Sequence, residues 1–171
     1  MATNTRSVDT SAAGLASLID AFESQTLPKA DWTHEAHVLT ALFYVVEAPA
    51  PLEKMRVGIQ RLNAAHGVVQ TESSGYHETI TCFYVWALQR YVEMERQQLR
   101  VYPGPTAWQL ANGALCYATR ELPLSYYSRE RLPSATARFP SSSRISIRCP
   151  PSRSRIRAVI TSHRFGDWPW P

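Results

Sequence analysis

Apolar residues recur every three or four positions in five stretches of this chain, and that spacing predicts helices. The first stretch shows the pattern most simply, at Leu15, Leu18, Ile19 and Phe22. Pro28, Pro49 and the segment 103–105 separate the stretches, because proline cannot continue a helix. We therefore expect helices over residues 11–24, 34–47, 51–66, 76–99 and 106–119. Since no strand pair or βαβ alternation is visible, the predicted fold class is all-α, a compact bundle of about five helices in a domain at 11–132.

Residues at the ends and faces of these helices give finer expectations. Asp31 or Thr33 should cap the second helix, and Pro51 should take the first position of the third. The second helix is apolar over more than half of its circumference, so it should be the most buried. On the fifth helix Trp108, Ala111, Leu115 and Ala118 should face inward, and the cysteines at 82 and 116 should be buried as small apolar residues.

The segment 133–171 differs in composition from the rest of the chain. It holds six Pro, eight Ser and seven Arg, with neither helical nor strand periodicity. This irregular, low-complexity tail has three interpretations, namely a shifted reading frame of a GC-rich gene, a natural disordered tail, or a basic functional arm. The tail carries a net charge of +6 and residues 1–132 carry −2. Because the positive charge belongs to the tail, the helical domain itself argues against a nucleic-acid partner.

Two further features bear on where the protein acts. The longest apolar run, Ala41–Val46, is far shorter than the ~18–20 residues of a membrane span, and residues 1–14 contain no apolar secretory segment. The cysteines at 82, 116 and 149 are odd in number and widely spaced, which argues against a disulfide framework and a Cys-rich zinc site. We expect a soluble, cytoplasmic protein with no membrane partner.

Two motifs place histidines at predicted helix starts, W-T-H-E-A-H at 32–37 and Y-H-E-T-I-T at 76–81. His34 and His37 stand one turn apart on the inward side of the second helix. His77 aligns with Thr81 and Tyr84 on the apolar side of the fourth helix. If the two helix starts are adjacent, the three histidines converge on one site.

Two kinds of chemistry fit such a site. In the first, His34, His37 and His77 bind a divalent transition metal, supported by Glu35 or Glu78. In the second, a helix start binds an anionic small molecule, and His37 or His77 acts as general acid or base.

Three motifs together resemble those of a family of small bacterial helical proteins of unknown function. They are L-P-K-A-D-W-T-H-E-A-H at 27–37, Y-H-E-T-I-T at 76–81 and L-P-L-S-Y-Y-S-R-E-R-L at 122–132. The family pattern combines a T-H-x-A-H motif with a Y-H-E-T-x-T motif. The resemblance implies that a single site contains His34, His37, His77, Glu78, Thr79 and Thr81, with Ser128 and Arg129 beside them. The chain after about residue 134 departs from the family ending, which favours the shifted-frame interpretation.

The functional expectation is a small-molecule site with histidine chemistry, in a metal-dependent or an acid/base enzyme. In it His37, His77 and Glu78 are the candidate catalytic residues, and Thr79, Thr81, Tyr84 and Arg129 the candidate substrate-binding residues. The alternative is a non-enzymatic binding module whose aromatic fourth helix pairs with another chain. An exposed apolar patch on that helix would favour the alternative.

Overall fold

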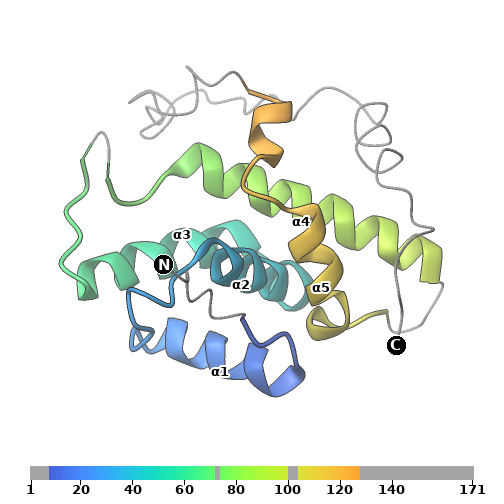
Figure 1. Ribbon diagram of the computed structural model, residues 1–171, viewed down its shortest axis with the longest axis horizontal. Coiled ribbons are helices and arrows are strands. Elements are labelled where there is room, and N and C mark those ends of the chain that lie inside the picture. The colour runs from blue at the N-terminus through green and yellow to red at the C-terminus, as the bar shows by residue number, and fades with distance from the viewer. Residues whose placement is uncertain (1–7, 72–73, 100–103, 128–171) are drawn as a thin grey trace, which may run out of the picture. The chain divides into compact units, whose positions relative to one another are not determined.

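The computed structural model describes residues 8–71, 74–99 and 104–127, and these residues form a helical bundle. They all belong to the first of two compact units, 1–141 and 142–171. The elements, shown in Figure 1, are α1 (Ala12–Glu23), α2 (His34–Glu47), α3 (Pro51–Ala65), α4 (Glu78–Leu99), α5 (Ala107–Tyr117) and a short 3₁₀ turn η1 (Leu122–Ser125). No strand occurs in this described part of the chain, so the prediction of an all-α fold with about five helices is confirmed. The predictions for the tail 133–171 lie outside the described residues.

The helix ends follow the expected local chemistry. Thr33 is the N-cap of α2, and its Oγ1 accepts a hydrogen bond from the Ala36 N–H at 3.3 Å. Pro51 occupies the first turn of α3, where a missing N–H costs nothing. Gly67, with φ of 64°, follows the C-cap of α3 in the left-handed conformation that glycine adopts without strain.

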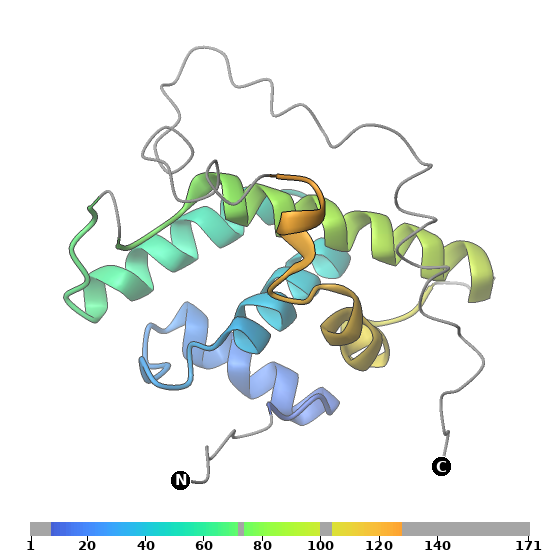
Figure 2. The same cartoon turned by 45° about the horizontal axis from the view of Figure 1, so that its top comes forward.

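Helix α2 is the central helix of the bundle. It contacts each of the other four helices, and in Figures 1 and 2 it lies between α1 on one side and α4 on the other. Half of its residues are buried, namely Ala36, Val38, Leu39, Thr40, Ala41, Leu42 and Tyr44. No other helix of the described chain has so large a share of buried residues, so the prediction that the second helix is the most buried one is confirmed.

Helix α5 buries only part of the face that its sequence suggested, because Ala111 and Ala118 lie inward as predicted and Leu115 is half-buried. Trp108 is 47% exposed and Cys116 is exposed, so the prediction that both lie inward is wrong. The buried face consists of Ala107, Leu110, Ala111 and Ala114, continued by Ala118 beyond the helix end. Because alanine lets helix backbones approach closely, this small-residue face packs on α2 and α4, and the bulky indole one position away remains outside.

Gly58 of α3 packs directly against Phe22 of α1, and its replacement by alanine tests this contact. A Cβ at position 58 would lie 2.3 Å from Cε1 of Phe22, whose side chain is fully buried. Alanine in a helix normally adds about 1 kcal/mol of stability over glycine. Here we expect Gly58→Ala instead to lower the free energy of unfolding by about 1–2 kcal/mol, because overpacking outweighs propensity. Urea denaturation measures the change, with the exposed Ala64→Gly as the propensity control. A more stable Gly58→Ala protein would show that the Phe22 ring yields freely.

Candidate functional site

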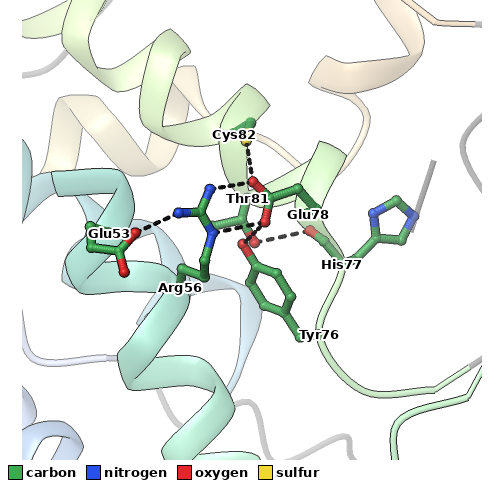
Figure 3. A network of polar contacts seen from close by, with 7 residues as sticks. All are labelled: Glu53, Arg56, Tyr76, His77, Glu78, Thr81 and Cys82. Carbon is green, nitrogen blue, oxygen red and sulfur yellow. Dashed lines mark hydrogen bonds and ion pairs between the residues drawn. The ribbon is translucent and has the colours of Figure 1, made fainter. Parts of the chain in front are cut away.

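The first turn of α4 is joined to α3 by a network centred on Glu78. Its carboxylate accepts two hydrogen bonds from Arg56, at 3.1 Å from Nε and 2.5 Å from Nη2. It also accepts the Tyr76 hydroxyl at 2.7 Å and the Cys82 thiol at 3.2 Å. Arg56 is held in addition by Glu53 of its own helix. Figure 3 shows these five side chains facing one another between the two helices.

This network keeps the Glu78 carboxylate ionised and supplies it with four hydrogen-bond donors. The bonds from Arg56 are the main cause that lowers the pKa of Glu78 to about 2, against partial burial that raises it. Burial, followed by the hydrogen bond to Glu78, raises the pKa of the Cys82 thiol to about 12 and raises that of the Tyr76 phenol above its usual range. A carboxylate with four donors has no lone pair left to orient a histidine or to move a proton. Glu78 therefore links α4 to α3 through its hydrogen bonds with Arg56.

His77 directly precedes Glu78 and accepts hydrogen bonds from the first turn of α4. Its Nδ1 accepts the N–H of Ile80 at 3.4 Å, as an N-cap does, and its carbonyl accepts both the N–H and the hydroxyl of Thr81 at 3.0 Å. In Figure 3 its ring points away from the Arg56–Glu78 pair. The Thr81 hydroxyl, a candidate for substrate binding, is thus engaged with its own helix.

His37 in the first turn of α2 has a fixed tautomer. Its Nδ1 lies 2.7 Å from the Thr33 carbonyl oxygen. Because a carbonyl only accepts, Nδ1 carries the hydrogen and Nε2 of the neutral ring holds a lone pair. In the described part of the chain Nε2 has no hydrogen-bond partner. The ring also lies against the indole of Trp32, with centroids 3.7 Å apart, and Trp32 stacks in turn on Phe22 at 4.9 Å.

Burial decides the charge of His37. It lowers the pKa of the imidazole to about 4, against the Thr33 carbonyl bond that raises it, while His34 and Arg120 lower it further. The ring is therefore neutral at physiological pH, and its Nε2 lone pair stays available for a ligand.

The side chains of His34 and Tyr84 form hydrogen bonds to the backbone that follows α5. Nε2 of His34 donates to the Ala118 carbonyl at 2.7 Å, and the Tyr84 hydroxyl donates to the Thr119 carbonyl at 2.9 Å. The two rings meet edge to face with centroids 5.3 Å apart. Both side chains thereby satisfy carbonyls that the end of a helix leaves without partners. The Tyr84 hydroxyl, a candidate for substrate binding, is used in this way.

The predicted site residues thus fall into two neighbourhoods. His34, His37 and Tyr84 meet at the first turn of α2, whereas His77, Glu78 and Thr81 belong to the first turn of α4. His77 precedes Tyr84 by seven residues, about 10 Å along α4 at ~1.5 Å per residue. Thr79 lies partly buried in the same first turn as Glu78. Ser128 and Arg129 lie outside the described residues.

The metal hypothesis gains no support from this arrangement. Over residues 8–71, 74–99 and 104–127, no group of three or more His, Cys, Asp or Glu side chains is placed to hold a metal ion. The divalent metal predicted for His34, His37 and His77 therefore remains a prediction from the sequence.

Arg120 belongs to the neighbourhood of His37 and did not stand out in the sequence. Its Nη2 lies 3.8 Å from Oε2 of Glu35. Its charge is one of the smaller causes that lower the pKa of His37 and of Glu35, and it opposes the burial that raises the pKa of Tyr84. The sequence pointed to Arg129 instead, because that residue follows a pair of tyrosines in a family-like motif. Arg120 differs from other exposed arginines because the chain before it contacts the first turn of α2, through the bond between His34 and the Ala118 carbonyl. No local motif in the sequence indicates that contact.

The aromatic face of α4 is covered by the chain's own later residues. Phe83 contacts the rings of Tyr126 and Tyr127 at 5.3 and 5.8 Å, and Trp86 contacts Tyr126 at 5.8 Å. These rings of α4 therefore have partners within the described chain, and the interaction module stays a prediction from the sequence.

Comparisons with protein-family models, with curated proteins and with solved structures give no match. Within the described residues, no helix is long and apolar enough to cross a membrane. The functional assignment therefore rests on the geometry of the site.

Proposed function

We propose that the protein is an enzyme that binds a small molecule at the first turn of α2, where His37 accepts a proton from the ligand. The observation that carries this proposal is the fixed tautomer of His37, with Nδ1–H given to Thr33 and Nε2 left without a partner in the described chain. A backbone carbonyl that fixes the ring in this way is the usual means of orienting a catalytic or ligating imidazole.

A second polar atom on the same helix supports a polar ligand here. The Thr40 hydroxyl is completely buried and has no hydrogen-bond partner in the described residues. Thr40 follows His37 by three residues, so the two side chains are neighbours one turn apart on α2. A buried hydroxyl without a partner costs stability, and a bound water or ligand hydroxyl would remove that cost.

The low pKa of His37 determines when the ring is a useful base. A proton acceptor is most effective when its pKa is near the working pH, and about 4 is too low for that. A bound anion would stabilise the imidazolium and raise this pKa toward neutrality. The proposal therefore favours an anionic substrate whose binding activates the base.

Acylation by diethyl pyrocarbonate tests the availability of Nε2, because the reagent attacks only unprotonated imidazole nitrogens. At pH about 5.5 an ordinary histidine is mostly protonated, whereas His37 remains neutral. We expect peptide mapping to find His37 modified faster than the other histidines of the folded protein. A slower reaction at His37 than at the others would contradict the proposal, because it would mean that Nε2 is closed to ligands.

A matched variant connects this availability to binding. In His37→Asn, the amide of asparagine retains a donor for Thr33 but loses the acceptor at Nε2. We expect small carboxylic acids or phosphate monoesters that bear a hydroxyl group to shift amide NMR signals of residues 34–37 in the wild type. Such ligands should bind the variant at least about tenfold more weakly. Equal affinities in the two proteins would exclude His37 as the acceptor.

A further inference from the structure

We propose that Arg120 binds the anionic group of the ligand, a carboxylate or a phosphate, and that Glu35 is the internal carboxylate which this group displaces. The inference rests on the proposed function, since it names the substrate class for the same site. The arginine expected from the sequence, Arg129, lies outside the described residues, whereas Arg120 lies within them.

The placement of Arg120 follows from the two residues before it. The carbonyls of Ala118 and Thr119 are held by His34 of α2 and Tyr84 of α4, at 2.7 and 2.9 Å. The backbone immediately before Arg120 is therefore fixed against the first turn of α2. Arg120 directly follows these two residues, so its side chain remains close to His34 and His37. Its positive charge is one cause of the lowered pKa of His37.

The guanidinium of Arg120 has no hydrogen bond to the described chain. Its one ionic contact is with Glu35 at 3.8 Å, which is longer than a hydrogen bond. Its side chain is 64% exposed, so a ligand reaches it from solvent. The five N–H groups form a planar fork that matches carboxylate and phosphate oxygens.

Glu35 is a weak competitor for this fork. The pKa of Glu35 is lowered mainly by its own backbone N–H, with the Thr33 side chain and the charge of Arg120 as smaller causes. The first turn of α2 also favours negative charge, since its N–H groups carry the positive end of the helix dipole. A ligand anion that binds Arg120 through two parallel hydrogen bonds therefore replaces the 3.8 Å ion pair with Glu35 by a stronger contact.

The charged and titratable groups around this position are consistent with one bound anion. They are His34, Glu35 and His37 of α2, Tyr84 of α4, and Arg120 and Glu121 after α5. The two cations available are Arg120 and a protonated His37. An anion beside Arg120 would offset the charge that now lowers the pKa of His37, and this links binding to the activation of the base.

Titration with inorganic phosphate and, separately, with acetate at constant ionic strength and pH about 7.5 tests the inference. Amide NMR signals of residues 34–36 and 119–121 give the affinity. We expect saturable binding of at least one probe in the wild type, about tenfold weaker binding in Arg120→Gln, and severalfold tighter binding in Glu35→Gln. Arg96→Gln is the matched control, because Arg96 is an exposed arginine without a protein partner in the described chain, and it should bind like the wild type.

The outcomes separate this inference from the proposed function. Unchanged affinity in Arg120→Gln, no gain in Glu35→Gln, or no saturable binding of either probe would overturn the role of Arg120. Because the contact of the anion with Arg120 does not use Nε2 of His37, His37→Asn should retain most of the affinity for the probe that the wild type binds. Failure of the His37 tests with an intact effect of Arg120→Gln would therefore reject the proton acceptor alone. Circular dichroism of every variant checks that the fold is retained.

Discussion

Exchanging Glu78 for glutamine should lower the free energy of unfolding by about 2 kcal/mol. The glutamine amide retains one acceptor oxygen but presents an NH₂ group to donors from Arg56, Tyr76 and Cys82. At least one of these donors then loses its partner. Urea denaturation at neutral pH measures the change. Glu53→Gln is the matched control, since that side chain is 58% exposed and touches the same Arg56, and it should cost no more than ~0.5 kcal/mol.

A double-mutant cycle with Arg56→Met isolates the pair itself. We expect a coupling energy between positions 56 and 78 of at least about 1 kcal/mol, because the two bonds are charge-assisted and Glu78 is only 16% exposed. Additive effects of the two substitutions would show that the pair does not fasten α3 to α4. The stabilisation by Glu78 should be complete above pH about 4.5 and should disappear as the pH falls toward about 2, where the folded carboxylate takes up its proton.

Acid should weaken the fold well before the carboxylates titrate, and His37 is the reason. Its pKa is about 4 in the folded protein and about 6.5 when unfolded, so the unfolded state binds the proton first. Stability from this group is therefore complete above pH about 6.5 and falls progressively as the pH drops toward about 4, by about 2–3 kcal/mol. The free energy of unfolding, measured by urea at several pH values, should show this slope.

The variant His37→Asn provides the comparison, since it cannot take up the proton. Its stability should be nearly independent of pH between about 7 and about 5, where that of the wild type declines. Parallel curves for the two proteins would show that the decline comes from another group. The contact of a protonated ring with Trp32 would resemble a cation–π interaction and would offset part of the loss, which is why we expect less than the full shift to appear.

The helices were predictable because each depends on local sequence. The stripe at Leu15, Leu18 and Phe22, the cap at Thr33 and the glycine at 67 act within a few residues, and all have the roles that local chemistry predicts. The face of α5 was predictable only in part, since Ala111 and Ala118 are buried as expected whereas Trp108 is exposed. Its core-facing residues are mostly alanines, which carry little hydrophobic signal, whereas the exposed Trp108 carries a strong one.

The candidate site was predictable only in part, for a related reason. The histidines were recognised as unusual at helix starts, but their partners lie far along the chain. Glu78 bonds to Arg56, 22 residues earlier, and His34 bonds to the Ala118 carbonyl, 84 residues later. Such pairs depend on how helices cross, which no short motif encodes. His34 and His77 have different hydrogen-bond partners, and the single site for the three histidines stays a prediction from the sequence.

The central position of α2 has a consequence for synthesis on the ribosome. Its residues 34–47 are made early, whereas α5, which covers one of its faces, begins only at Ala107. About 60 residues must be added in between, which takes roughly 3–12 s at ~5–20 residues per second. During that interval the face of α2 that α5 later covers has no helix packed against it. Because exposed apolar surface favours aggregation, the order of the helices leaves the growing chain prone to aggregate until α5 has been made.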